Sequence, residues 1–139
     1  MLISESDSCC HWFSSGVRRH EYSIELSQKF FDEIVRNPVP VDLRALNALK
    51  TSCMRMDVYI WLTYRMSRLT KSVDIPWVGL QRQFGSGYPE TAIGTRDFRV
   101  KFIKALKVVV ATVYPAANLS VSTPHLTLHP SPVPIQPKR

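Results

Sequence analysis

Apolar and polar residues first alternate regularly over residues 21–26, where Tyr22, Ile24 and Leu26 share one face of an extended chain. This period of two is typical of a strand with one buried face, so residues 21–26 are predicted to form a β-strand. Residues 1–20 mix serine, cysteine and aromatic residues without a clear period. We expect this N-terminal segment to be poorly ordered.

Two short helices are predicted next. Ser27 can accept hydrogen bonds from the first amides of a helix that ends at Asn37 and Pro38. The apolar residues of that helix, at helical spacing, are Phe30, Phe31, Ile34 and Val35. Asp42 can cap the second helix in the same way. Its apolar residues are Leu43, Ala45, Leu46, Ala48 and Leu49.

Residues 53–69 are apolar on nearly every side of a helix, which indicates a position in the middle of the core. Trp61 and Tyr64 in this segment are therefore predicted to be packing residues and not a surface for stacking bases. A short strand over residues 73–75 and a helix from Pro76 to Phe84 follow, with Trp77 and Leu80 on its buried side.

The connection after this helix is predicted to be rich in turns. Gly85 stands where a helix commonly ends in the left-handed conformation. Residues 84–89 and 91–94 continue with glycine, proline, serine and threonine, so that the next helix is expected to start at Thr95.

The helix over residues 95–113 is predicted to have two unlike faces. Four apolar residues share one face, namely Phe98, Phe102, Leu106 and Val109, with Ile103 and Val110 beside them. Four cations lie on the opposite face: Arg96, Lys101, Lys104 and Lys107. Arg99 falls near the apolar edge, where it either extends to solvent or reflects a local rotation of the helix. Asp97 is expected to pair with Lys101.

Tyr114 and Pro115 end this helix, and a β-hairpin is predicted behind it. Leu119 and Val121 alternate with serines, Leu126 and Leu128 alternate with threonine and histidines, and Thr123 and Pro124 form the turn. Residues 130–139 contain four prolines and are expected to form an extended tail that contributes nothing to the core.

The order of these elements predicts a mainly helical α+β domain of the winged-helix type, a helix-turn-helix with a C-terminal β-hairpin as the wing. The expected domain covers residues 21–129, between the N-terminal segment and the proline-rich tail. Residues 76–84 would be the supporting helix and residues 95–113 the recognition helix, which fits the major groove of DNA.

Charge is distributed unevenly in this chain of 139 residues with a net charge of +7. Residues 1–57 carry 7 basic and 8 acidic side chains, whereas residues 58–139 carry 11 basic and 3 acidic ones. Excess positive charge in one part of a chain favours a polyanionic partner. The longest segment without charged residues, 108–137, is apolar only as far as Ala117, so no membrane span is expected. Three cysteines and no signal-peptide pattern favour the cytoplasm.

Two other classes of function fit the sequence less well. Cys9, Cys10, His11 and His20 are metal-ligand types, but adjacent cysteines chelate one ion poorly, and His125 and His129 lie too far apart on a strand to share a metal. Residues 85–87 lack the lysine and hydroxyl of a phosphate-binding loop, and no nucleophile-elbow motif occurs. We therefore expect neither a cofactor nor catalysis.

Five blocks of the sequence resemble the C-terminal part of the RepA family of plasmid replication initiators. They are ELSQKFFDEIVRNPVPVDLRALNALK, CMRMDVYIWLTYRMSRL, IPWVGLQRQFG, YPETAIGTRDFRVKFIKALK and VYPAANLSVSTPHLTLHPSPVPI, five separate blocks within roughly residues 21–135. The resemblance implies sequence-specific binding of double-stranded DNA at repeated sites of a plasmid origin in the bacterial cytoplasm. It also implies contacts with host initiator and helicase proteins, and a homodimer is a further possibility.

The resemblance implies initiators whose chains are about twice as long as this one. A truncated gene, a gene remnant and an independently expressed domain are all open, and binding by this chain alone is expected to be weak. The candidate DNA-binding residues are Arg82, Arg96, Arg99, Lys101, Lys104 and Lys107. The alternative is a protein–protein interaction module, for dimerisation or for docking of a helicase or initiator, without strong DNA binding of its own.

Overall fold

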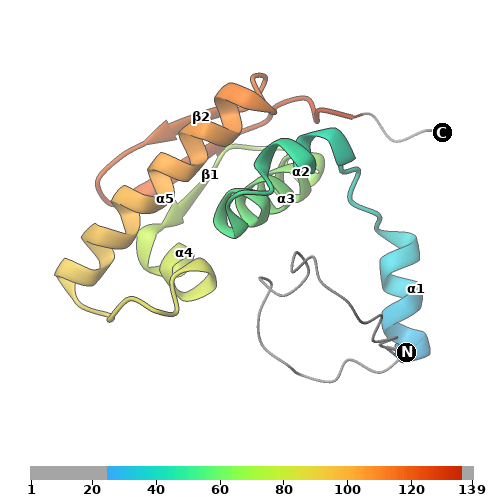
Figure 1. Cartoon of the computed structure of the whole chain (residues 1–139), viewed down its shortest axis with the longest axis horizontal. Helices are drawn as coiled ribbons and strands as arrows, with labels where there is room; N and C mark the ends of the chain where they lie inside the picture. Colours follow the sequence, from blue (N-terminus) through green and yellow to red (C-terminus); the bar gives the residue numbers. More distant parts are fainter. Residues whose placement is uncertain (1–24, 136–139) are drawn as a thin grey trace, which may run out of the picture. The chain divides into compact units, whose positions relative to one another are not determined.

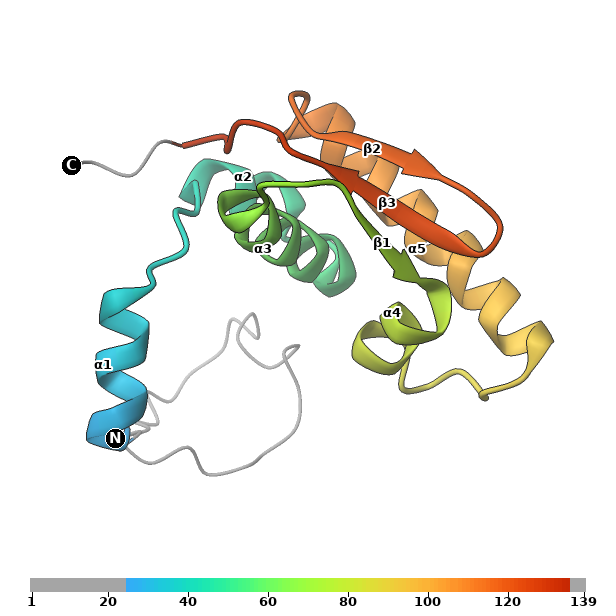
Figure 2. The same cartoon turned by 180° about the vertical axis from the view of Figure 1, so that it is seen from behind.

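A computed structural model describes residues 25–135 of the chain (Figures 1 and 2). Contacts divide the chain into two units, with the boundary between Pro38 and Val39. The first unit contains helix α1 (Gln28–Arg36), and every other helix and strand belongs to the second. The two units are therefore described separately.

Helix α1 begins and ends at the predicted residues. The Ser27 Oγ accepts a hydrogen bond from the Phe30 amide at 3.3 Å, and Asn37 is the C-cap. No residue of α1 is buried, and its apolar side chains Phe30, Phe31, Ile34 and Val35 are 47–60% exposed. The predicted strand over residues 21–26 lies almost entirely outside the described residues. Glu25 forms an isolated bridge, and Leu26 lies in no strand.

The second unit contains four helices and three strands in its described part. The helices are α2 (Leu43–Leu49), α3 (Cys53–Arg68), α4 (Trp77–Phe84) and α5 (Ala92–Thr112). The strands are β1 (Val73–Pro76), β2 (Asn118–Val121) and β3 (His125–His129). All three strands pair antiparallel in the order β1-β3-β2, with Ile75 opposite Leu126 and Leu119 opposite Leu128. The predicted α+β class, mainly helical, is confirmed.

Figures 1 and 2 show α5 lying along one face of this small sheet, with α2 and α3 beside it. The core forms where α3, α4, α5 and the inner face of the sheet meet. Its fully buried side chains include Val58, Tyr59 and Leu62 of α3 and Leu126 and Leu128 of β3. The central place predicted for residues 53–69 is therefore confirmed.

Trp61 and Tyr64 of α3 have different environments, although both were predicted to pack. Trp61 is 8% exposed and makes edge contacts with Phe84 and Phe102. Tyr64 is 40% exposed, and the guanidinium of Arg68 lies 4.9 Å from the centre of its ring. The prediction for Tyr64 was wrong because α3 presents one narrow face, including Ile60, to solvent.

Two glycines serve close packing at the connection between α4 and α5, Gly85 at the end of α4 and Gly94 in the first turn of α5. The expected left-handed conformation at Gly85 was wrong, since its φ is −125°. A Cβ at Gly85 would lie 2.5 Å from the Phe98 ring, and a Cβ at Gly94 would meet the Pro89 carbonyl oxygen. The connection is also shorter than predicted. Helix α5 begins at Ala92, with the Thr91 side chain accepting from the Gly94 amide at 3.1 Å.

The C-terminal segment contributes to the core, contrary to the expectation for residues 130–139. Val133 packs against the core cluster, and the buried Tyr114 donates its hydroxyl proton to the Pro132 carbonyl oxygen at 3.0 Å. Residues 136–139 lie outside the described part. In residues 25–135, no helix is long and apolar enough to cross a membrane.

The buried hydroxyl of Tyr114 makes the free energy of unfolding vary with pH in the alkaline range. Burial first, and the neighbouring Tyr59 second, raise the pKa of Tyr114 from 10.0 to about 12. Because the folded state holds this proton more tightly than the unfolded state, its contribution is complete below pH 10 and is lost as pH rises toward about 12. That loss approaches about 1.4 kcal/mol per pH unit. In this pH range, we expect the free energy of unfolding of Tyr114→Phe to fall less with rising pH than that of the unaltered protein. Urea unfolding at several pH values measures both slopes. Identical slopes would contradict it.

Candidate nucleic-acid interface

Helix α5 is fixed to the core by one face. Phe98, Phe102 and Val109 are fully buried and Leu106 is 1% exposed, as their spacing predicts. Phe102 lies among the rings of Trp61, Trp77 and Phe84, with centroid distances of 6.1, 6.2 and 5.4 Å. Such contacts add stability beyond area burial and allow little rotation of the helix. The orientation of α5 about its own axis is therefore set by its aromatic side.

The opposite face of α5 carries the four predicted cations. Arg96, Lys101, Lys104 and Lys107, which we call the cationic face, are all exposed. Arg96 pairs with Asp97 at 3.1 Å, and both side chains are at least half exposed, so this ion pair is weak. Among residues 25–135 none of the three lysines has an ion-pair partner within 4.0 Å, and the expected pair between Asp97 and Lys101 is absent. Their charge is directed to solvent.

Arg82 lies apart from this face, on α4. Its Nε donates to the Glu90 carboxylate at 3.1 Å, and both side chains are more than 60% exposed. The hydrogen bond with Glu90, followed by the charge of that carboxylate, raises the pKa of Arg82. The pair links α4 to the segment before α5, so Arg82 already has an acidic partner. Whether it contacts DNA stays a prediction.

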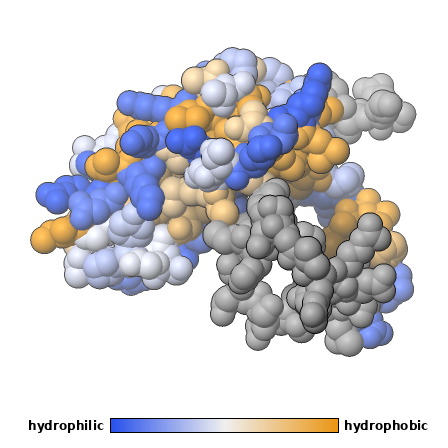
Figure 3. Space-filling model, viewed as in Figure 1, coloured by the Kyte–Doolittle hydropathy of each residue, from blue (hydrophilic) through white to orange (hydrophobic). Residues whose placement is uncertain are grey.

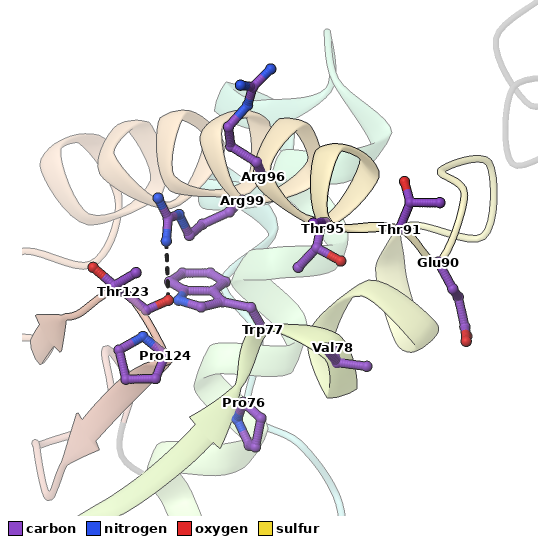
Figure 4. A pocket seen from close by; sticks show the side chains of 11 residues that line it. Pro76, Trp77, Val78, Glu90, Thr91, Thr95, Arg96, Arg99, Thr123 and Pro124 are labelled. Atoms are coloured by element: carbon purple, nitrogen blue, oxygen red, sulfur yellow. Dashed lines mark hydrogen bonds between the residues drawn. The ribbon is translucent and has the colours of Figure 1, made fainter.

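Arg99 also lies off the cationic face, at the edge where the sequence analysis placed it. Its Nη1 donates to the Thr123 carbonyl oxygen in the hairpin turn at 3.0 Å. Nearby, the Trp77 indole nitrogen donates to the Ser122 carbonyl at 2.9 Å. Figure 4 shows Arg99 directed toward Thr123, whereas Arg96 points away from Thr123. Arg99 therefore fastens the hairpin to α5.

A cavity of about 460 Å³ lies at this junction. Its lining comes from the start of α4, the N-terminal half of α5 and the hairpin turn (Figure 4): Pro76, Trp77, Val78, Glu90, Thr91, Ala92, Thr95, Arg96, Arg99, Thr123 and Pro124. Both arginines that line it belong to the predicted DNA-binding set. The cavity is thus continuous with the candidate interface.

A buried glutamine, which sequence reasoning missed, fixes the connection that leads into α5. Gln81 is 2% exposed, and its Nε2 donates to the Pro89 carbonyl at 2.9 Å and to the Tyr88 carbonyl at 3.3 Å. Its Oε1 accepts the Thr95 hydroxyl at 2.6 Å. The sequence contained a signal for this role, because Gln81 is a polar residue four positions after Trp77, on the buried side of α4.

Sequence reasoning also missed two exposed apolar residues on α5. Ile93 is 66% exposed and Val100 is 62% exposed. Over α5, in the orientation of Figure 1, hydrophobic and hydrophilic residues alternate at the surface (Figure 3). A helical wheel places Val100 between Arg96 and Lys104, so the sequence contained this signal.

The hairpin histidines have separate partners. His129 accepts or donates hydrogen bonds at 2.9 Å with both Ser72 and Ser120, while the His125 Nε2 lies 3.6 Å from Asp74. Within the described part, no group of three or more potential metal ligands lies together. The other predicted metal-ligand types, Cys9, Cys10, His11 and His20, fall outside the described residues.

Comparison with known families gives a match over the N-terminal part of the chain. Residues 14–77 match the model of a family described as plasmid encoded RepA protein, which confirms the resemblance over that part of the chain. The matched segment includes α1, α2, α3 and β1, and it ends before the cationic face of α5. Neither the curated proteins nor the solved structures gave a match.

The buried glutamine can be tested by comparing two substitutions on α4. Gln81→Leu keeps the side chain's size but leaves the Thr95 hydroxyl and the Pro89 carbonyl without their partner. We expect it to lower the free energy of unfolding by about 2–3 kcal/mol. Gln83→Leu, at an exposed position of the same helix, should change it by less than about 0.5 kcal/mol. Urea unfolding of both variants measures the difference, and equal effects would refute the assigned role.

Proposed function

We propose that this chain, which carries the C-terminal region of the RepA family over residues 14–77, is a winged-helix protein that binds double-stranded DNA. The family indicates a plasmid replication protein. The finer proposal is sequence-specific binding to repeated sites of a plasmid replication origin, as part of a replication initiator. The function is binding, without a catalytic step.

The order of the elements supports the winged helix. Helix α3 precedes β1, α4 and α5 follow as a helix-turn-helix pair, and β2 and β3 form the hairpin. β1 pairs with β3 and so joins the hairpin to the helices in one sheet. In this arrangement α5 is the recognition helix and the turn between β2 and β3 is the tip of the wing.

The cationic face of α5 carries the proposal. A helix fits the major groove of B-DNA, and lysine and arginine side chains at its sides reach the phosphates of both strands. The buried aromatic face turns these four cations outward together. Because no acidic side chain of residues 25–135 lies within 4.0 Å of the three lysines, they would not have to break ion pairs before binding a phosphate.

The wing has a different role from that of α5. Residues 108–135 contain no lysine or arginine, so the hairpin adds no fixed positive charge. Its tip is bonded to Arg99 and Trp77, which holds it beside the N-terminal half of α5. We therefore assign most of the affinity to α5. Arg82 and Arg99 are secondary contacts, since each already bonds another group of the protein.

Partners beyond DNA belong to the same hypothesis. Origin melting with host initiator and helicase proteins, and a homodimer on paired repeats, follow from the family resemblance. Each of these roles at an origin requires that the chain binds DNA. The experiment that follows therefore measures DNA binding by the single chain.

Salt dependence distinguishes DNA binding from a protein–protein module. If the four cations each neutralise one phosphate, the logarithm of the binding constant should fall with the logarithm of salt concentration with a slope of about −3 to −4. Fluorescence anisotropy with a labelled plasmid-origin repeat and a scrambled duplex measures this slope. Tighter binding of the repeat is the expected sign of specificity.

Single substitutions test whether the salt dependence of binding comes from α5. Lys104→Gln should weaken binding to both duplexes and reduce the magnitude of the slope by about one. Lys50→Gln, an exposed lysine next to α2, is the matched control and should leave the slope unchanged. A slope near zero in the unaltered protein, or equal effects of the two variants, would reject α5 as the DNA-binding element.

A further inference from the structure

Val100 stands at the middle of the cationic face. Four residues separate it from Arg96 and from Lys104, which places these cations about 40° to either side of it around the helix axis. Ile93 lies two turns earlier on nearly the same line, and Lys107 lies two turns after Val100. Val100 and Ile93 therefore form an apolar centre line that Arg96 and Lys104 flank and that ends at Lys107.

Core packing does not explain this centre line. Val100 and Ile93 are 62% and 66% exposed, on the side of α5 opposite to Phe98 and Phe102. Valine is also a poorer helix former than alanine, lysine or glutamate, because its branched Cβ restricts the side chain. Neither core packing nor helix propensity therefore accounts for two aliphatic residues on this side of α5.

We infer that Val100, assisted by Ile93, reads thymine methyl groups in the major groove. The inference rests on the proposed function and names the bases that this face prefers. When cations on both borders of a recognition helix contact phosphates, the middle of the helix faces the base edges. An aliphatic side chain cannot pair with the polar edges of guanine or cytosine. It packs favourably against the C5-methyl group that thymine alone presents there.

The adjacent side chains support this chemistry. The exposed ion pair of Arg96 with Asp97 is weak, and lysine side chains are long enough to reach phosphates beyond Val100. Val100 is shorter and has no polar atom to hydrate, so contact with a methyl group removes water from both partners. Burial of one methyl group corresponds to about a fourfold gain in affinity, and burial of two to about fifteenfold.

Replacing thymine with deoxyuracil tests the inference, since this change removes only the methyl group. The probes are a 24-base-pair duplex of alternating A and T and its counterpart of alternating A and U, with anisotropy measured on the full chain. We expect about four- to fifteenfold tighter binding of the thymine duplex. Val100→Ala, which favours the helix and creates no cavity, should bring the ratio close to one.

Two controls make the result decisive. Ile60→Ala removes an exposed aliphatic side chain from another helix, α3, and should keep the full preference for thymine. Circular dichroism confirms that both variants are folded. Equal binding of the two duplexes by the unaltered chain, or a preference that survives Val100→Ala, would overturn the inference and leave the proposed DNA binding intact. Failure to bind either duplex would overturn both.

Discussion

Burial of the aromatic side of α5 is the constraint on which the remaining structure depends. Trp61, Trp77 and Phe84 surround the ring of Phe102. The ring of Phe98 packs against Phe102 and Tyr88. Large rings in fixed contact leave the helix one orientation. The direction of the lysines is thus determined from the inside of the protein, although none of them takes part in the packing.

The connection between α4 and α5 sets where that helix begins. Gln81 bonds two carbonyl groups of the connection and one side chain of α5. Gly85 and Gly94 allow Phe98 and Pro89 to approach closer than any larger residue would permit. A buried polar network with all partners in place, combined with two close contacts, makes this a rigid joint. The elements with the proposed function therefore hold a defined angle.

Local patterns in the sequence predicted most of the fold. The caps Ser27 and Asp42, the central helix and the hairpin depend on neighbouring residues and on period, which a sequence shows directly. The errors involve distant contacts. Three features depend on residues that folding brings together: the close contact at Gly85, the exposure of Tyr64 and the packing of Val133. For the candidate site, the exposure of the four α5 cations was predictable. The bond from Arg99 to the hairpin and the network of Gln81 were not.

The bond between Arg99 and the Thr123 carbonyl has a consequence for how the molecule meets a partner. Because the hairpin turn, the start of α4 and α5 are joined by side-chain bonds, they form one preorganised surface. A surface of this kind loses little conformational entropy on binding. In the proposed complex with DNA, the cost of any mismatch in shape would fall on the duplex, whose flexible base steps bend more easily than others. Sequences that curve readily would then gain an advantage even at positions that the protein does not touch.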